Sequence, residues 1–200
     1  MRFVFGQEAT ARRDRSGVFS SAQTIIDVKT LPCWLLVADI KGSTVLASSL
    51  PTTEMAVLVG KWMAACKEVV DQHGGSINKY LGDGFLAYSY ANAERMPDFM
   101  GMIEKLTAMQ HQRQGPPFRL ALHYGLVTVG GGGSAGEDSL SGRDVALVFR
   151  MEKLGGALGC DLLVSDAARG HLPETVQLTD VGIHALPGFE SEKLRFYALG

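Results

Sequence analysis

The feature that most constrains the fold is a short apolar run at residues 33–40, which reads CWLLVADI. It lacks the alternation of polar and apolar residues that a half-exposed strand shows, and is typical of a strand buried on both faces of a sheet. Other elements must therefore cover this strand on both sides. The 200 residues of the chain, 46% of them hydrophobic, suffice for one such domain. The run nevertheless contains a carboxylate, Asp39, and the turn-forming residues Gly42 to Thr44 follow it closely.

The residues that follow predict helices and further strands in alternation. Apolar residues recur at helical spacing across 52–73, and two glycines end that helix. Residues 76–90 are predicted to form a strand, a tight turn at 82–84 and a second strand. The remaining predicted elements are a helix at 92–112, a strand at 118–130 that continues into a glycine-rich loop, a helix at 143–155, a strand at 161–165, a short helix at 166–172, and strands near 176–181 and 193–199.

The central order of strand, helix, hairpin, helix and strand is that of a ferredoxin-like βαββαβ core. We therefore predict an α+β fold of this type with extra C-terminal strands. Residues 1–30 contain a charged, turn-prone stretch, ATARRDRSG, and are predicted to form an N-terminal arm or accessory hairpin. The main domain is expected to span 31–200, with its boundary near Leu31 and Pro32.

Charge and cysteine content exclude several classes of protein. A formal net charge of −2 implies no general affinity for nucleic acid or for an anionic membrane. The three cysteines, Cys33, Cys66 and Cys160, form no CxxC pair and are expected to be buried thiols in a reducing compartment. No segment approaches the roughly 20 apolar residues that span a bilayer, and the first residues do not resemble a signal peptide. We therefore expect a cytoplasmic protein with no membrane segment in this chain.

Two aspartates are the first candidates for chemistry. Asp39 ends the central strand and Asp83 occupies the turn of the predicted hairpin, and these elements are commonly neighbours in a βαββαβ sheet. Two carboxylates at one point repel each other unless a proton or a cation relieves the repulsion, and hard oxygen ligands suit Mg²⁺ or Mn²⁺. The alternative is that Asp39 caps the next helix and Asp83 only serves its turn.

Four motifs in order resemble one known family. VADIKGST, GGSINKYLGDGFLAYS, RLALHYGLVTVG and LSGRDVALVFRMEKLG occur in the order and approximate spacing of the class III adenylate/guanylate cyclase catalytic domain. The resemblance covers about residues 33–199. It implies the cyclase type of ferredoxin-like fold, and conversion of a nucleoside triphosphate to its 3′,5′-cyclic monophosphate and pyrophosphate.

The resemblance also implies a metal and phosphate site. Asp39 and Asp83 match the family's metal-binding aspartates, and the backbone carbonyl of Ile40 would help to hold two Mg²⁺ or Mn²⁺ ions per site. The segment from Gly42 through Ser43 to Thr44 would pass close to the phosphates. Among the arginines, Arg119 matches the one that contacts the terminal phosphates, and Arg150 the one that stabilises charge on the α-phosphate in the transition state.

Base recognition is implied at Lys79, which matches the position where lysine accompanies adenine and glutamate accompanies guanine. Lysine can donate to adenine N1, which is an acceptor. The partner position falls on Ser139, or on Asp138 if the loop register differs by one residue. ATP is therefore the favoured substrate, with GTP and pyrimidine triphosphates as alternatives. His123 is expected to be an ordinary strand histidine.

The chain departs from the family pattern at two positions. Ala146 stands where the family has a ribose-orienting asparagine, so turnover is expected to be impaired. Pro187 stands where a lysine often reaches phosphate, which leaves that contact missing unless Lys193 replaces it. A nucleotide-binding pseudo-cyclase that regulates a partner is therefore the alternative function.

The family's sites are shared between two protomers. One protomer supplies the metal aspartates, and the other supplies the base-reading lysine, the asparagine position and the arginine. The resemblance therefore implies a head-to-tail homodimer with composite sites.

Overall fold

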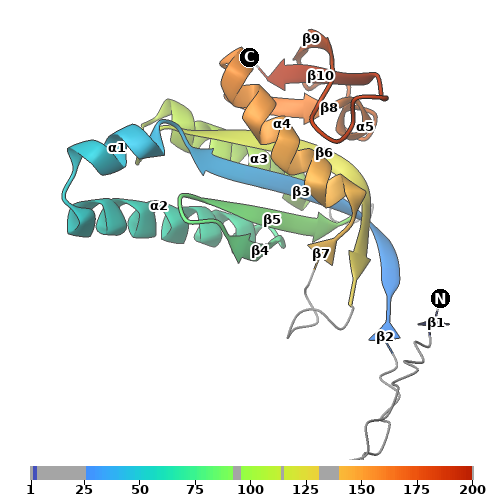
Figure 1. Ribbon diagram of the computed structural model, residues 1–200, viewed down its shortest axis with the longest axis horizontal. Coiled ribbons are helices and arrows are strands. Elements are labelled where there is room, and N and C mark those ends of the chain that lie inside the picture. The colour runs from blue at the N-terminus through green and yellow to red at the C-terminus, as the bar shows by residue number, and fades with distance from the viewer. Residues whose placement is uncertain (1, 4–25, 92–95, 114, 131–139, 200) are drawn as a thin grey trace, which may run out of the picture.

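The computed structural model describes residues 2–3, 26–91, 96–113, 115–130 and 140–199 (Figure 1). Its centre is an eight-stranded sheet in which the strands follow the order β4-β5-β3-β6-β8-β10-β9, with β7 paired to β6. A separate two-stranded ladder joins β1 to β2. The strands are β1 Arg2–Phe3, β2 Ile26–Asp27, β3 Lys29–Ile40, β4 Ser76–Tyr80, β5 Gly84–Tyr90, β6 Phe118–Val129, β7 Leu140–Ser141, β8 Leu162–Ser165, β9 Leu178–His184 and β10 Leu194–Leu199.

The helices are α1 Ser43–Ser49, α2 Thr52–Gln72, α3 Met96–His111, α4 Arg143–Leu158 and α5 Asp166–Arg169. The order β3-α2-β4-β5-α3-β6 forms an antiparallel core in which β4, β5, β3 and β6 are successive neighbours. This is the predicted ferredoxin-like α+β arrangement. The chain then adds α4, and β8 pairs with β6 in parallel.

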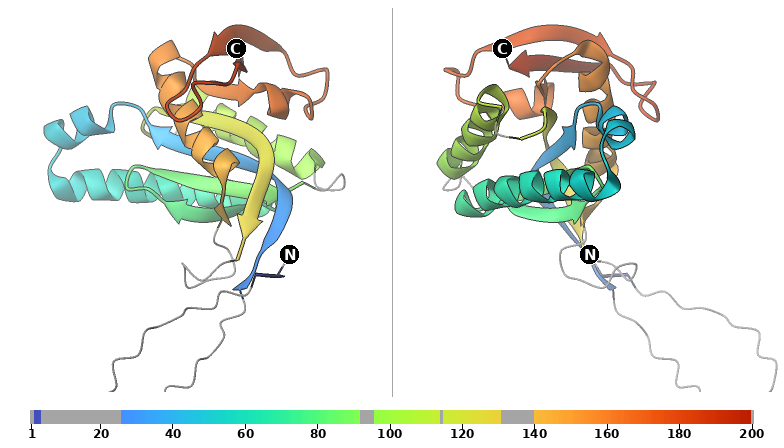
Figure 2. Two further views of the ribbon diagram at one scale, coloured as in Figure 1. Left: turned by 45° about the vertical axis from the view of Figure 1, so that its right-hand side comes forward. Right: turned by 90° about the vertical axis from the view of Figure 1, so that its left-hand side faces the viewer.

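The central strand β3 is covered on both faces, as its unbroken apolar run predicts. Helices α2 and α3 lie on one face of the sheet and α4 lies on the other (Figure 2). Successive β3 side chains alternate between the two cores, so that Trp34 and Leu36 pack with α2 and α3, whereas Leu35 and Val37 pack with α4. Asp39 follows Val37 in this alternation and lies on the α4 face.

The N-terminal part differs from the prediction in one respect. Strand β3 begins at Lys29, so it crosses the expected boundary near Leu31 and Pro32. Within residues 1–30, β1 and β2 pair antiparallel, and most of the expected arm lies outside the described residues. The division of the chain at residue 30 stays a prediction.

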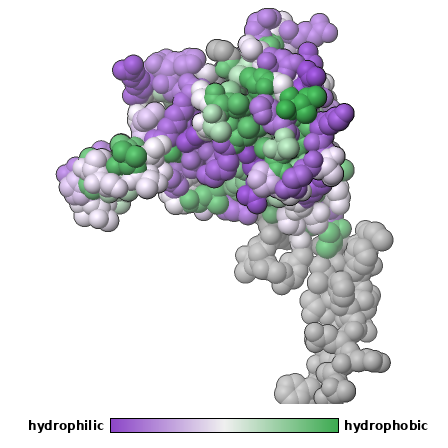
Figure 3. Space-filling model, turned by 45° about the horizontal axis from the view of Figure 1, so that its top comes forward, coloured by the Kyte–Doolittle hydropathy of each residue, from purple (hydrophilic) through white to green (hydrophobic). Residues whose placement is uncertain are grey.

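A short helix, α1, which was not predicted from the sequence, precedes α2 and is separated from it by Pro51. Together α1 and the start of α2 project from the body of the molecule (Figure 1). The surface of this projection carries apolar residues (Figure 3), among them Val45 and Val57, which are 72% and 55% exposed. Among the described helices, none has the length and apolar character needed to cross a membrane.

Candidate active site

The sheet register brings Asp39 and Asp83 together. Asp39 in β3 lies opposite Gly84, the first residue of β5, and Ile40 N donates a hydrogen bond to Asp83 O at 3.1 Å. Gly84 permits this approach, because a Cβ there would lie 2.5 Å from Ala38 O and 3.1 Å from Asp39 Oδ1. The Asp-Gly sequence of the hairpin therefore places the second carboxylate beside the first.

Asp39 lies in a strongly acidic environment. Burial, together with the negative charges of Glu152 and Asp83, raises the pKa of Asp39 to about 6 against the opposing effect of Lys153 and Arg119. A carboxylate held this way gains from a cation that neutralises the pair. Sequence reasoning missed Glu152, although its charge on an otherwise apolar helix face is a signal for a buried ion pair.

Arg119 lies between two carboxylates. It is directly opposite Asp39 in the β3–β6 register, with Nη2 3.9 Å from Asp39 Oδ2 and Nε 3.1 Å from Glu152 Oε1. Its guanidinium occupies space beside α4 that only a glycine leaves free, since a Cβ on Gly156 would collide with Nη1. The side chain is 18% exposed, so Arg119 is a largely buried ion-pair partner and not an ordinary surface arginine.

The turn after β3 presents exposed backbone next to Asp39. Gly42 has φ +64° and precedes α1, and no other atom lies within 4 Å of the place where its Cβ would be. No side chain caps this helix start, so the amides of Ser43 and Thr44 are free of helical partners. Lys41 fixes the turn through its backbone hydrogen bond to Pro117 O at 2.7 Å and an ion pair with Asp161.

A second set of predicted residues lies on α4 and beside it. Ala146 and Arg150 are exposed one turn apart on α4, and within the described part of the chain Arg150 makes no hydrogen bond or ion pair. Lys79 on β4 is also exposed, and its Nζ lies 6.0 Å from the ring centroid of Phe149 on α4. Lys79 therefore lies with the exposed residues of α4. Within the described residues, no hydrogen bond or ion pair joins Lys79, Ala146 or Arg150 to Asp39 or Asp83.

The sequence also points to Asp138, Ser139 and His123. Ser139 and Asp138 lie outside the described residues. His123 is buried, with Nδ1 2.8 Å from Ser165 Oγ and Nε2 3.6 Å from Asp144 Oδ1. These contacts agree with its expected structural role.

The oxygen donors around Asp39 suit a divalent cation that is also bound by ligands from outside the protein. In the described part of the chain, no group of three or more His, Cys, Asp or Glu side chains is arranged to hold a metal ion. The available donors are the carboxylates of Asp39 and Asp83 and the Ile40 carbonyl, because Glu152 is paired with Arg119 and Lys153. An all-oxygen set with few protein ligands suits Mg²⁺ or Mn²⁺ bound together with phosphates.

Comparison with known sequences yields two curated relatives that are both named adenylate cyclase. Adenylate cyclase of Anabaena cylindrica is 25% identical over 159 residues, which are 72% of this chain and 32% of the relative. Adenylate cyclase 2 of Rhizobium meliloti (strain 1021) is 29% identical over 177 residues, which are 82% of this chain and 48% of the relative. The chain therefore spans less than half the length of either relative. No protein-family model matches it.

Solved structures share the fold at low sequence identity. The adenylyl cyclase CyaB from P. aeruginosa superposes with a TM-score of 0.69 at 21% identity, covering 87% of this chain and 96% of that one. The guanylate cyclase domain of RhGC from Catenaria anguillulae, solved in complex with GTP, gives 0.71 at 18% identity, covering 86% and 98%. A non-canonical dimeric guanylyl cyclase domain from Blastocladiella emersonii gives 0.70 at 18%, with the same coverage. These findings confirm the resemblance, and the chain has the fold of a class III nucleotidyl cyclase catalytic domain.

Proposed function

We propose that this chain is a class III nucleotidyl cyclase domain that converts a nucleoside triphosphate, preferentially ATP, to its 3′,5′-cyclic monophosphate and pyrophosphate. The observation that carries the proposal is the pairing of Asp39 with Asp83 beside the exposed turn at Gly42. Both curated relatives are named adenylate cyclase, which supports the reaction class.

The aspartate pair would hold the cations of the reaction. Asp39, Asp83 and the Ile40 carbonyl offer hard oxygen donors at one point, and their mutual repulsion is relieved by positive charge. When bound there, Mg²⁺ or Mn²⁺ would favour deprotonation of the ribose 3′-hydroxyl and neutralise the triphosphate. Asp39 and Asp83 are held by β3 and by the hairpin, so their oxygen donors are in position before the substrate reacts. The reaction therefore does not require these side chains to lose further conformational freedom.

The triphosphate would lie against backbone and arginine donors. The free amides of Ser43 and Thr44 and the open space at Gly42 allow oxygen atoms to approach the main chain. Arg119 carries a forked, permanently charged donor toward the same place. Its 3.9 Å separation from Asp39 Oδ2 is longer than a direct hydrogen bond. Arg119 therefore has hydrogen-bonding capacity left for phosphate oxygens.

The substrate base would be read by Lys79 with Ser139, or with Asp138. A lysine donor matches the N1 acceptor of adenine and opposes the N1–H donor of guanine, so ATP is favoured over GTP. Within the described residues no hydrogen bond or ion pair joins Lys79 or Arg150 to the aspartates. We therefore favour a head-to-tail homodimer, in which the partner subunit's Arg150 would complete each site.

A regulatory pseudo-cyclase is the second candidate function. The observation that favours it is Ala146, an exposed methyl group at the position where the family orients the ribose with an amide. Such a chain would bind nucleotide and pair with an active subunit without turning substrate over itself.

A product assay separates these functions. The protein, at a concentration that saturates the dimer, is incubated with ATP, GTP, CTP and UTP in turn, with Mg²⁺ or Mn²⁺, and cyclic products are identified by mass spectrometry. We expect cyclic AMP as the main product, and a loss of more than about 10²-fold in Asp39→Asn and in Asp83→Asn. Absence of any cyclic product from all four substrates, together with nucleotide binding, would instead establish the pseudo-cyclase.

A further inference from the structure

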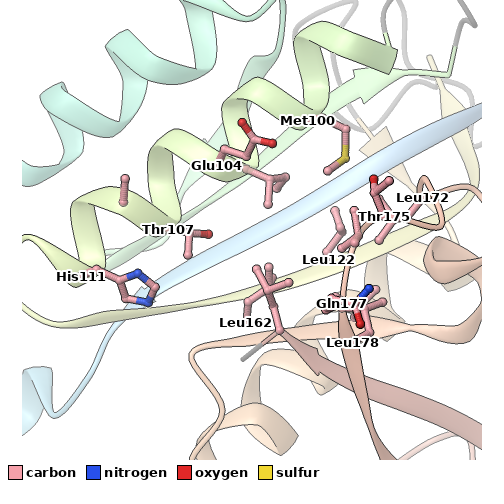
Figure 4. A pocket seen from close by; sticks show the side chains of 15 residues that line it. Met100, Glu104, Thr107, His111, Leu122, Leu162, Leu172, Thr175, Gln177 and Leu178 are labelled. Carbon is pink, nitrogen blue, oxygen red and sulfur yellow. The ribbon is translucent and has the colours of Figure 1, made fainter.

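A cavity of about 450 Å³ lies between α3, strands β6 and β8, and the segment that leads into β9 (Figure 4). It is on the face of the sheet that α2 and α3 cover, because its lining residue Leu122 belongs to the core on that side. Asp39 and Arg119 face α4 on the opposite side of the sheet. The cavity is therefore separate from the candidate active site.

Most of the cavity wall is apolar. Leu122, Leu162 and Val164 come from the two strands, and Ile103 and Ala108 come from α3. Figure 4 shows the strand leucines facing the α3 side chains across an open space. Its volume falls within the range of pockets that bind small molecules, roughly 300–1,000 Å³, which are typically apolar with a few polar groups.

One buried polar group in this wall has no partner. Thr107 Oγ1 is inaccessible to solvent and makes no hydrogen bond within the described part of the chain, and Figure 4 shows the Thr107 side chain pointing from α3 toward the cavity. A buried hydroxyl without a partner is costly, so a ligand that hydrogen-bonds to it would gain from relieving that cost. A hydroxyl can accept from an amine or a hydroxyl of such a ligand and can donate in return.

The charges around the cavity restrict the ligand further. Glu104 is the acidic residue among the described lining residues, and these include no lysine or arginine. A negative group in the cavity would be repelled by Glu104 without a compensating cation. His111, at one end of the cavity, is the other titratable lining residue.

From these features we propose that the cavity is a second binding site, for a small and mostly apolar molecule that carries an amine or hydroxyl group and no negative charge. The apolar wall would bury two or three fused rings or a group of similar size. The polar group would reach Thr107 Oγ1 after rotation of the Thr107 side chain turns this buried atom into the cavity.

Two fluorescent probes of the same shape test this chemistry at pH 8. 1-Aminoanthracene has three fused rings and an uncharged amine, and 1-anthracenecarboxylate has the same rings with an anionic group at the same position. We expect saturable binding of 1-aminoanthracene to the full chain, and binding of the carboxylate that is at least about tenfold weaker. Neither measurement needs nucleotide or metal, so the result does not depend on the proposed enzymatic function.

Variants locate the bound probe. Ala108→Trp fills the cavity from α3 and should weaken 1-aminoanthracene binding at least about tenfold, whereas Ala65→Trp, at an exposed position on α2, should leave it unchanged. Thr107→Val keeps the side-chain shape without the hydroxyl and should weaken binding roughly two- to tenfold. Gln177→Trp narrows the cavity from an exposed lining position outside the core, and replaces Ala108→Trp if circular dichroism shows that the latter does not fold.

Three results would contradict the proposed binding site or its ligand class. The proposal is wrong if 1-aminoanthracene does not bind saturably to the wild-type chain. It is also wrong if folded Ala108→Trp and Gln177→Trp both bind the probe as tightly as wild type. Equal affinity for the amine and the carboxylate would overturn the proposed ligand class.

Discussion

At the scale of single residues, the candidate site is a balance of buried charges centred on Asp39. Burial and two acidic neighbours, Glu152 and Asp83, oppose its ionisation, whereas Arg119 and Lys153 favour it. The net effect is a raised pKa, so in the absence of a cation the site carries an unrelieved negative charge at neutral pH. A cation that enters the site therefore finds ligands that are already in place and gains by neutralising them.

This balance predicts a pH-dependent cost to stability. The Asp39 pKa is about 6 in the folded chain and close to 3.9 in the unfolded chain. The folded state therefore binds the proton more tightly than the unfolded state does. The ionised Asp39 carboxylate thus destabilises the folded chain, fully above about pH 6 and less and less as the pH falls toward 4. We expect Asp39→Asn, in urea unfolding with a metal chelator, to raise the free energy of unfolding by about 1–3 kcal/mol at pH 7.5 and by almost nothing at pH 4. A constant effect at both pH values would contradict the charge balance.

Ala146 supplies the second prediction at this scale. Ala146→Asn adds an amide at an exposed position of α4 one turn before Arg150, where the resemblance places the ribose-orienting group. We expect kcat for cyclic AMP to rise by on the order of 10²-fold with little change in KM, because an orienting hydrogen bond acts mainly in the transition state. Ala157→Asn, at another exposed alanine of the same helix, is the matched control. An equal response of both variants would remove Ala146 from the site.

At the scale of elements, a close contact between β6 and the first turn of α4 fixes the position of the helix that carries Arg150. Asp144, in the first turn of α4, accepts a hydrogen bond from Leu126 N at 2.7 Å. Its carboxylate occupies the space beside Gly125, where a Cβ would collide with Oδ2. His123 and Arg143 hold the pKa of Asp144 below its usual range, together with the Leu126 amide, so Asp144 stays ionised at neutral pH.

A pair of glycine substitutions tests this contact between β6 and α4. Gly125→Ala should lower the free energy of unfolding by about 1–3 kcal/mol, since it forces Asp144 away and leaves a backbone amide without its partner. Gly60→Ala, on α2 where no other atom lies within 4 Å of the added Cβ, should raise it by about 0.5–1 kcal/mol through helix propensity. Chemical denaturation measures both, and adding Asp144→Ala to Gly125→Ala should remove the steric part of the loss.

Elements with strong local signals could be predicted from the sequence, and the ion-pair network could not. The apolar run at 33–40 and the Asp83–Gly84 turn have local signatures, so β3 and the hairpin lie where expected. The contacts of Arg119 with Asp39 and Glu152 depend on the register of β3 against β6 and on the depth at which α4 packs, which no short stretch encodes. Helix α1 was missed because it has only seven residues, no capping side chain and no buried side chain, so it leaves no apolar pattern in the sequence.

At the scale of the whole molecule, the residues of the candidate site fall into two groups. Asp39, Asp83 and the turn at Gly42 form one half, and Lys79 with the exposed α4 residues Ala146 and Arg150 forms the other. Within the described residues no hydrogen bond or ion pair connects the halves. A C₂ dimer in which one half faces the partner's other half would use both halves twice.

Mixing two inactive variants tests this arrangement directly. Asp39→Asn damages one half and Arg150→Ala the other, so each homodimer contains two defective sites. A heterodimer of the two variants has one intact site and one doubly defective site. If subunits exchange freely, an equal mixture contains half heterodimers and should recover about a quarter of the wild-type activity per chain.

Dilution below the dimer dissociation constant should abolish that recovered activity and the wild-type activity alike. Catalysis within a single chain predicts the opposite on both counts: the mixture stays inactive, and the wild-type activity per chain does not depend on concentration.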